Sequence, residues 1–280
     1  SLGAEMVSVI DVATGREMLW CADPAVWNRH APILFPYAGK LTGGHFLAED
    51  GKIYEGGQHG FARDLEHRLV SQTANELTFE LTSGGETYAY FPYDFALRST
   101  YTLEGRRISH SVAVRNTGKG TLRFGFGYHP GFALPFDDAH TAEDYDVVFD
   151  TVESPLCLNT APNGLVCASP DYYLARNVDR IPLSAKLFAH DSHCMVNLKS
   201  KTMAVVERDT GRRIVVDIAD FPYTLIWSTP QEPMRFICIE PWHSIPSEDN
   251  GPIEWEKKPC AASLAPNEMW QTTLNMTFER

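Results

Sequence analysis

The sequence lacks the features that mark several large classes of protein. No apolar run approaches the roughly 20 residues of a membrane-spanning helix. Acidic residues outnumber basic ones, 36 to 24, and the formal net charge of −12 is spread without long runs, whereas nucleic-acid binding requires a basic face. Residues 1–5 contain neither the basic nor the apolar region of a signal peptide. We therefore expect a cytoplasmic protein that binds neither nucleic acid nor membranes.

Motifs for metal binding, disulfides and serine nucleophiles are also missing. The stretch His190-Asp191-Ser192-His193 has ligand-type side chains, but its flanks predict strand and loop, and neither an HExxH helix nor a cysteine pair accompanies it. We therefore predict no metal site. No G-x-S-x-G elbow occurs. Six cysteines without a CxxC pair, in a chain large enough to bury its own core, predict reduced thiols; they lie at positions 21, 157, 167, 194, 238 and 260.

Apolar and polar residues alternate at period two along much of the chain, whereas no segment longer than about ten residues shows an amphipathic helical stripe. Because the predicted strands are joined by hairpin turns without βαβ spacing, we predict an all-β fold: a large antiparallel β-sandwich with few short helices, forming one domain over residues 1–280. Residues 130–182 are the least regular and predict long loops that cross a sheet's rim. The clearest strand patterns cover residues 75–82, 95–103, 108–114, 202–207, 213–218 and 270–278.

Two stretches combine side chains suited to binding. Gln58-His59-Gly60-Phe61-Ala62-Arg63 places a titratable ring, a flexible glycine and a guanidinium within six residues, which suits a small polar ligand, although His-Gly pairs are also common in ordinary loops. Residues 125–132 end a strand in small and aromatic residues and present His129 directly before a proline. This histidine is either a functional group or a hydrogen-bonded residue at a strand end.

Residues 235–243 give a sharper signal. Their apolar run is typical of a strand buried on both faces, and Glu240 ends that run at a Pro-Trp corner. A buried glutamate needs a partner or a function. Two explanations remain open from the residues alone, namely a salt bridge, for example to Arg63 or Arg235, and an active site.

The chain resembles the aldose 1-epimerases in four separated motifs, and more narrowly the bacterial branch of galactose mutarotase-like proteins that carries a His-Gly-Phe-Ala-Arg signature. The resemblance extends from about residue 3 to residue 278. Family members usually have a strand or so before the segment that matches residues 3–5, so we expect an N-terminal stretch to be absent. The motifs are residues 58–63, 128–132, 221–223 with 226–228, and 238–242, and residues 31–36 fit the same branch.

This resemblance implies a large antiparallel β-sandwich whose concave face holds a sugar, and a reaction that interconverts the α and β anomers of an aldose without a cofactor. It implies Glu240 as the general base and His129 as the general acid, because a glutamate is ordinarily ionised near neutrality whereas a histidine can hold a proton to donate. It further implies that His59, Arg63, Asp191 and Trp227 contact or orient the sugar.

Some expectations stay open within the resemblance. The alternatives to a mutarotase are a non-catalytic sugar-binding or sugar-sensing protein and a hexose-6-phosphate 1-epimerase, which would need basic residues at the rim. Many relatives have an arginine where this chain has Lys40, and a lysine cannot make the same bidentate contact. The expected partner is a small-molecule sugar, and the expected state is a monomer or homodimer.

Overall fold

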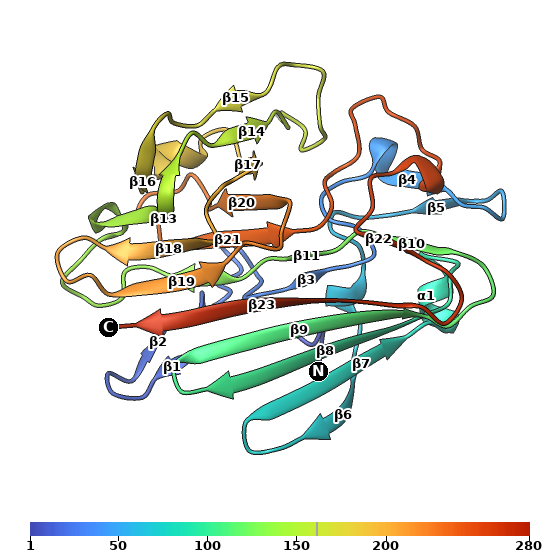
Figure 1. Ribbon diagram of the computed structural model, residues 1–280, viewed down its shortest axis with the longest axis horizontal. Helices are drawn as coiled ribbons and strands as arrows, with labels where there is room; N and C mark the ends of the chain where they lie inside the picture. The colour runs from blue at the N-terminus through green and yellow to red at the C-terminus, as the bar shows by residue number, and fades with distance from the viewer. Residues whose placement is uncertain (161) are drawn as a thin grey trace.

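The computed structural model describes residues 1–160 and 162–280, and most of its strands belong to two large antiparallel sheets (Figure 1). A nine-stranded sheet contains β16 (Val178–Pro182), β13 (Tyr145–Glu153), β18 (Thr202–Glu207), β19 (Arg213–Asp217), β23 (Met269–Glu279), β9 (Arg107–Asn116), β8 (Phe95–Glu104), β7 (Glu76–Thr82) and β6 (Arg68–Gln72), in that order. The predicted all-β sandwich is thereby confirmed.

An eight-stranded sheet forms the other layer. Its order is β15 (Tyr172–Tyr173), β14 (Leu156–Leu158), β17 (His193–Val196), β20 (Tyr223–Trp227), β21 (Phe236–Trp242), β11 (Gly127–Tyr128) and β3 (Ile33–Leu34), while β12 (Gly131–Ala133) also pairs with β21. Three small two-stranded sheets pair β1 (Ile10–Asp11) with β2 (Arg16–Glu17), β4 (His45–Leu47) with β5 (Ile53–Glu55), and β10 (Leu122–Phe124) with β22 (Ala262–Leu264).

The helices of the described residues are all short, as predicted from the missing helical stripe. None of them is long and apolar enough to cross a membrane. They comprise α1 (Gly85–Tyr88) and the 3-10 turns η1 (Thr42–Gly44), η2 (Ala62–Asp64), η3 (Ala142–Asp144), η4 (Ala185–Phe188) and η5 (Trp255–Lys257).

The predicted hairpins are present, but the prediction of long loops over residues 130–182 is wrong in part. That region contains β13, which pairs with both β16 and β18 in the nine-stranded sheet. In β13 the side chains of Tyr145, Val147 and Phe149 are buried in the core. The alternation of β13 is hard to recognise in the sequence because acidic residues and prolines surround it. Asp146, a residue type that is usually exposed, is buried here and forms ion pairs with Arg208 and Arg180.

The two sheets pack through one continuous apolar core. Val112 and Leu274 of the nine-stranded sheet belong to the same buried cluster as Ile237 and Ile239 of β21. Because side chains of a strand alternate between its faces, Cys238, Glu240 and Trp242 of β21 point away from this core. Every residue of β21 is nevertheless buried, which confirms the prediction of a strand covered on both faces.

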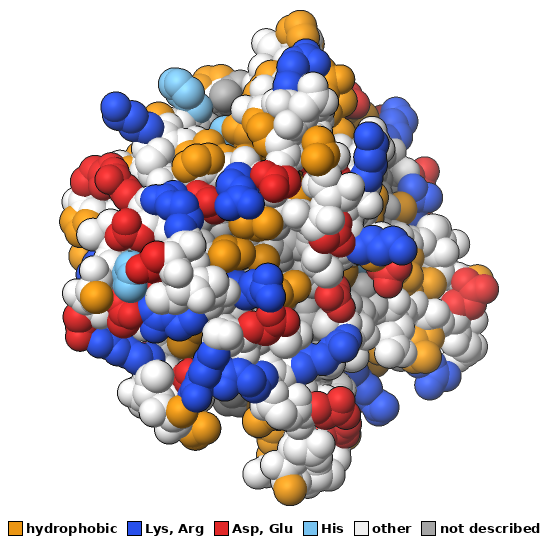
Figure 2. All heavy atoms as spheres, turned by 60° about the vertical axis from the view of Figure 1, so that its left-hand side comes forward, with side chains coloured by type: hydrophobic (Ala, Val, Ile, Leu, Met, Phe, Trp, Pro, Cys, Tyr) orange, Lys and Arg blue, Asp and Glu red, His pale blue; other side chains and the backbone are white. Residues whose placement is uncertain are grey.

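The face of the molecule in Figure 2 shows basic and acidic side chains interspersed, with apolar side chains scattered between them. This mixing agrees with a sequence that has a net charge of −12 and no long runs of one charge. This face therefore has no large basic surface (Figure 2).

Acid should weaken the fold through His110, whose side chain is only 3% exposed and lies under the stacked ring of Tyr101. Its Nε2 lies 2.6 Å from Ser99 Oγ. Burial lowers the pKa of His110 to about 3. Between the usual histidine pKa of about 6.5 and pH 3 the unfolded chain binds the proton and the folded chain does not, so stability falls as pH falls through that range.

From pH 7 to pH 5 we expect His110 alone to cost about 2 kcal/mol of unfolding free energy. Urea unfolding at both pH values measures this, and His110→Gln should lose correspondingly less stability between them than wild type. The matched control is His190→Gln, at an exposed histidine, which should keep the wild-type pH dependence. An unchanged pH dependence in His110→Gln would contradict the assignment.

Candidate active site

A cavity of about 350 Å³ lies on the side of β20 and β21 that faces away from the core. Its volume is within the range of small-molecule sites. All six side chains that the sequence analysis singled out lie in its wall, although they come from segments far apart in the chain: His59, Arg63, His129, Asp191, Trp227 and Glu240.

Strand register places His129 opposite Glu240. Gly127 pairs with Trp242, and Gly131 pairs with Cys238, so the chain between the two glycines passes Glu240 at its midpoint. His129 Nε2 lies 3.2 Å from Glu240 Oε2. Neither of the two arginines proposed as salt-bridge partners pairs with Glu240. Arg235 instead pairs with Asp23 at 2.7 Å, and Arg63 Nη2 donates to the Gln58 carbonyl.

Burial determines the protonation of this pair. Glu240 is 2% exposed and His129 is 6% exposed. Burial, reinforced by the charge of Asp191, raises the pKa of Glu240 well above its usual value. Burial, reinforced by the charge of Arg63, lowers the pKa of His129 to about 3. Desolvation thus disfavours both the carboxylate and the imidazolium, contrary to the sequence-based expectation that both would be charged near neutrality.

Since the two groups are in contact, they titrate as one unit. A carboxyl group that donates to a neutral imidazole and a carboxylate beside an imidazolium each hold one proton. The raised pKa of Glu240 and the lowered pKa of His129 therefore favour a pair that holds one proton, whichever atom carries it. His129 Nδ1 is buried and has no hydrogen-bond partner among the described residues.

Backbone hydrogen bonds fix His59 at the side of this pair. His59 N donates to the Gly39 carbonyl (2.8 Å), and Gly39 N donates to His59 Nδ1 (2.9 Å). Because Nδ1 accepts, the proton of the neutral ring sits on Nε2. Burial, with the charges of neighbouring basic groups, lowers the pKa of His59 well below its usual value, so the ring is neutral, and its Nε2 lies 3.1 Å from the side-chain amide nitrogen of Gln58.

Arg63 lies on η2, where it joins the loop to the wall of the cavity. Its Nη2 donates to the Gln58 carbonyl at 2.7 Å, while its Nε is buried without a hydrogen-bond partner among the described residues and lies 3.9 Å from Asp64 Oδ2. Arg29 also lines the cavity; it pairs with Asp64 and donates to the Arg63 carbonyl. Two guanidinium groups therefore stiffen this wall.

The remaining predicted residues take different positions. Trp227, on β20, meets His129 edge to face, with 5.7 Å between ring centroids. Asp191 is exposed at the mouth of the cavity, in a turn with a φ of 85°. Lys40 does not line the cavity, and its Nζ donates to the Asn163 carbonyl at 2.7 Å.

The sequence analysis missed two tryptophans that enclose the pair. Trp27 stacks on His129, with 4.9 Å between ring centroids, and Trp242 meets His59 edge to face at 5.5 Å. The glycines near His129 make room for them, because a Cβ would lie 2.7 Å from the Trp27 ring at Gly131 and 2.5 Å from the Trp242 ring at Gly127. Glycines at 127 and 131 are visible in the sequence, but the sequence does not identify the side chains that pack against them.

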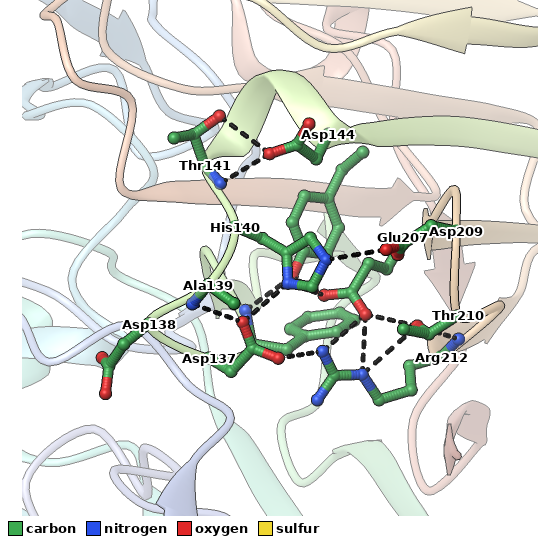
Figure 3. A network of polar contacts seen from close by, with 12 residues as sticks. Asp137, Asp138, Ala139, His140, Thr141, Asp144, Glu207, Asp209, Thr210 and Arg212 are labelled. Atoms are coloured by element: carbon green, nitrogen blue, oxygen red, sulfur yellow. Dashed lines mark hydrogen bonds and ion pairs between the residues drawn. The ribbon is translucent and has the colours of Figure 1, made fainter.

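A second polar cluster lies outside the cavity wall and has a structural role (Figure 3). Asp137, His140 and Glu207 offer ligand atoms close enough together for a metal. Arg212 already occupies that space, pairing with both carboxylates, while Tyr145 and Thr210 donate to buried Glu207. The cluster ties the residues before β13 to the β18–β19 turn.

Among the residues that the structure describes, the other group with metal-ligand spacing is His129, Cys238 and Glu240. The predicted absence of a metal at residues 190–193 concerns different side chains: His190 is exposed, and His193 is held between the Tyr172 hydroxyl and the Leu187 carbonyl.

Comparison with known proteins agrees with this architecture. The sequence profile of the aldose 1-epimerase family matches residues 1–277. Protein LacX (chromosomal) of Lactococcus lactis subsp. lactis is 32% identical over 285 aligned residues, covering 99% of this chain and 94% of LacX. A galactose mutarotase related enzyme from Lactobacillus acidophilus has 30% identity and a TM-score of 0.93, covering 100% of this chain and 92% of that one.

A galactose mutarotase-like protein from Lactobacillus casei ATCC 334 is 28% identical with a TM-score of 0.88, and the match covers 99% of this chain and 95% of that one. The fold class is therefore that of the galactose mutarotase-like β-sandwiches. The chain belongs to the aldose 1-epimerase family.

The site should depend on Gly60, because its φ of 71° and its closeness to Phe35 admit no side chain. A Cβ there would lie 2.1 Å from the Phe35 carbonyl oxygen. We expect Gly60→Ala to lower the unfolding free energy by more than about 1 kcal/mol and to displace His59. The matched control is Gly57→Ala, where a Cβ meets nothing within 4 Å; denaturant unfolding should show it within about 0.5 kcal/mol of wild type. Equal stability of the two variants would contradict this account.

Proposed function

We propose that the protein is an aldose 1-epimerase that interconverts the α and β anomers of a free hexose or related sugar. The observation that carries the proposal is the buried contact of 3.2 Å between His129 and Glu240 in the wall of a sugar-sized cavity. Family membership supports the reaction class.

Anomer interconversion needs a base for the anomeric hydroxyl and an acid for the ring oxygen. Both oxygens are bonded to the same carbon, so an acid and a base that lie side by side can reach them together. Glu240 accepts the hydroxyl proton as His129 donates its proton to the ring oxygen, and the C1–O5 bond breaks. The aldehyde then rotates and the same transfers run in reverse, so the pair ends with the one proton it began with.

The surrounding groups suit a neutral polyol. Trp227 offers an apolar ring, Asp191 accepts hydrogen bonds from hydroxyl groups, Arg63 supplies donors, and His59 presents its Nε2 beside the Gln58 amide. A hexose 6-phosphate has less support. Arg29 is already paired with Asp64, and the Lys40 ammonium is turned to the Asn163 carbonyl.

We further propose that residues 1–280 form one domain that acts in the cytoplasm as a monomer or homodimer, without a cofactor. The six cysteines form no disulfide, which supports a cytoplasmic location because the cysteines of secreted proteins are usually oxidised to disulfides.

Removing either member of the pair should abolish most of the catalysis. We expect Glu240→Gln and His129→Asn each to lower kcat/KM by about 10²- to 10⁴-fold, because each loses one proton-transfer group. NMR saturation exchange between anomers measures this on glucose, galactose and their 6-phosphates. The control Glu256→Gln, at an exposed position, should match wild type. A wild type that binds sugar without accelerating exchange would make the protein a binder, and acceleration surviving both substitutions would overturn the assigned roles.

Glu240→Gln should also make the protein more stable at alkaline pH. The pKa of Glu240 is raised by burial, so the stability that its protonated form contributes is present below the usual pKa and is lost as pH rises through the raised one. A neutral amide avoids that loss. We expect a rise in Tm of about 2–4 °C at pH 8, shrinking as pH falls toward 4.5. A lower Tm than wild type at pH 8 in differential scanning calorimetry would contradict a charge burial cost at this site.

A further inference from the structure

Trp27 contacts the catalytic pair, and the proposed mechanism gives it no role. Its ring stacks on that of His129 at 4.9 Å with an interplanar angle of 27°, and it stacks on Phe236 at 5.4 Å and 16°. Trp227 approaches the rings of Trp27 and His129 edge to face. An indole face therefore lies against the imidazole.

The irregular segment that carries Trp27 is firmly anchored. Trp27 N donates to the Asp23 carbonyl at 2.9 Å, and the Trp27 carbonyl accepts from Trp20 Nε1 at 2.7 Å. Asp23 in turn pairs with Arg235, whose guanidinium lies over the Trp20 ring. Gly131 leaves space for the ring, and these contacts together fix the position of the indole.

We infer that Trp27 is a positioning residue that holds His129 against Glu240 and, through the negative face of its indole, favours the state of the pair in which the proton lies on the imidazole. An aromatic face attracts a cation, so it stabilises an imidazolium over a neutral imidazole. This inference rests on the proposed function, because only the imidazolium can serve as the acid while Glu240 serves as the base.

The neighbouring charges make such support necessary. Burial opposes the imidazolium, and the Arg63 charge opposes it further. Asp191 repels the carboxylate form of Glu240, while His59 is neutral and adds no compensating charge. Cys238, beside the pair, is a buried thiol whose pKa is raised by burial, so it stays uncharged. Within the described residues, Trp27 is the aromatic side chain stacked on the His129 ring. Its attraction for the imidazolium offsets part of the desolvation cost of charging that ring.

The test compares Trp27→Leu, which keeps an apolar cover but removes the aromatic face, with Trp27→Phe, which retains a weaker one. For Trp27→Leu we expect kcat to fall about three- to tenfold with KM within about twofold, and the alkaline limb of the kcat/KM profile to move to lower pH by up to about one unit. Trp27→Phe should restore most of both. Unchanged kcat and alkaline limb in Trp27→Leu, or an effect confined to KM, would overturn the inference, the latter making Trp27 a sugar platform.

A second readout does not depend on activity. The ring ¹⁵N shifts of His129, followed from pH 8 to pH 5, should show less imidazolium in Trp27→Leu than in wild type at each pH, with Trp27→Phe between them. Equal populations would overturn the inference. If the wild type does not accelerate anomer exchange, the proposed function is wrong, but the comparison of imidazolium populations still tests the role of Trp27. The same spectra show whether each variant is folded.

Discussion

A glutamate that is only 2% exposed needs a partner that forms a hydrogen bond or ion pair with its carboxyl group. For Glu240 that partner is His129, whose Nε2 lies 3.2 Å from Glu240 Oε2. Desolvation acts on the two side chains in opposite directions, raising the pKa of Glu240 and lowering that of His129. Both shifts favour a pair that holds one proton. One proton, two adjacent acceptors and a cavity beside them are the elements that epimerisation at an anomeric carbon requires.

The rest of the structure serves to hold that contact. Alternation along β21 sends Ile237 and Ile239 into the core between the sheets and leaves Glu240 on the opposite side. The register of β11 and β12 on β21 then brings His129 to the same level. Gly60 lets the 58–63 loop approach Phe35 closely enough for His59 to reach the site. The site is thus built on strands, and only its walls come from loops.

Much of this was predictable from sequence. Period-two alternation predicts the sandwich and its hairpins, and a carboxylate in an apolar run marks Glu240 without knowledge of the fold. Three things were not predictable. The strand β13 is masked by surrounding acidic and proline residues, and buried Asp146 interrupts its pattern. Trp27 lies in an irregular segment with no periodicity, so its contact with His129 depends on tertiary packing. The protonation of the pair depends on burial, which no local pattern reports.

The central claim is that Glu240 and His129 share a single proton in the folded protein near neutral pH. Isotope-edited NMR tests it directly, with ¹³C in the Glu240 carboxyl group and ¹⁵N in the His129 ring observed together between pH 6 and 8. The account predicts one proton on the pair throughout, seen either as a protonated carboxyl with a neutral ring or as a carboxylate with an imidazolium, or as exchange between them. A carboxylate beside a neutral ring at pH 7, with no proton on either group's facing atom, would contradict it.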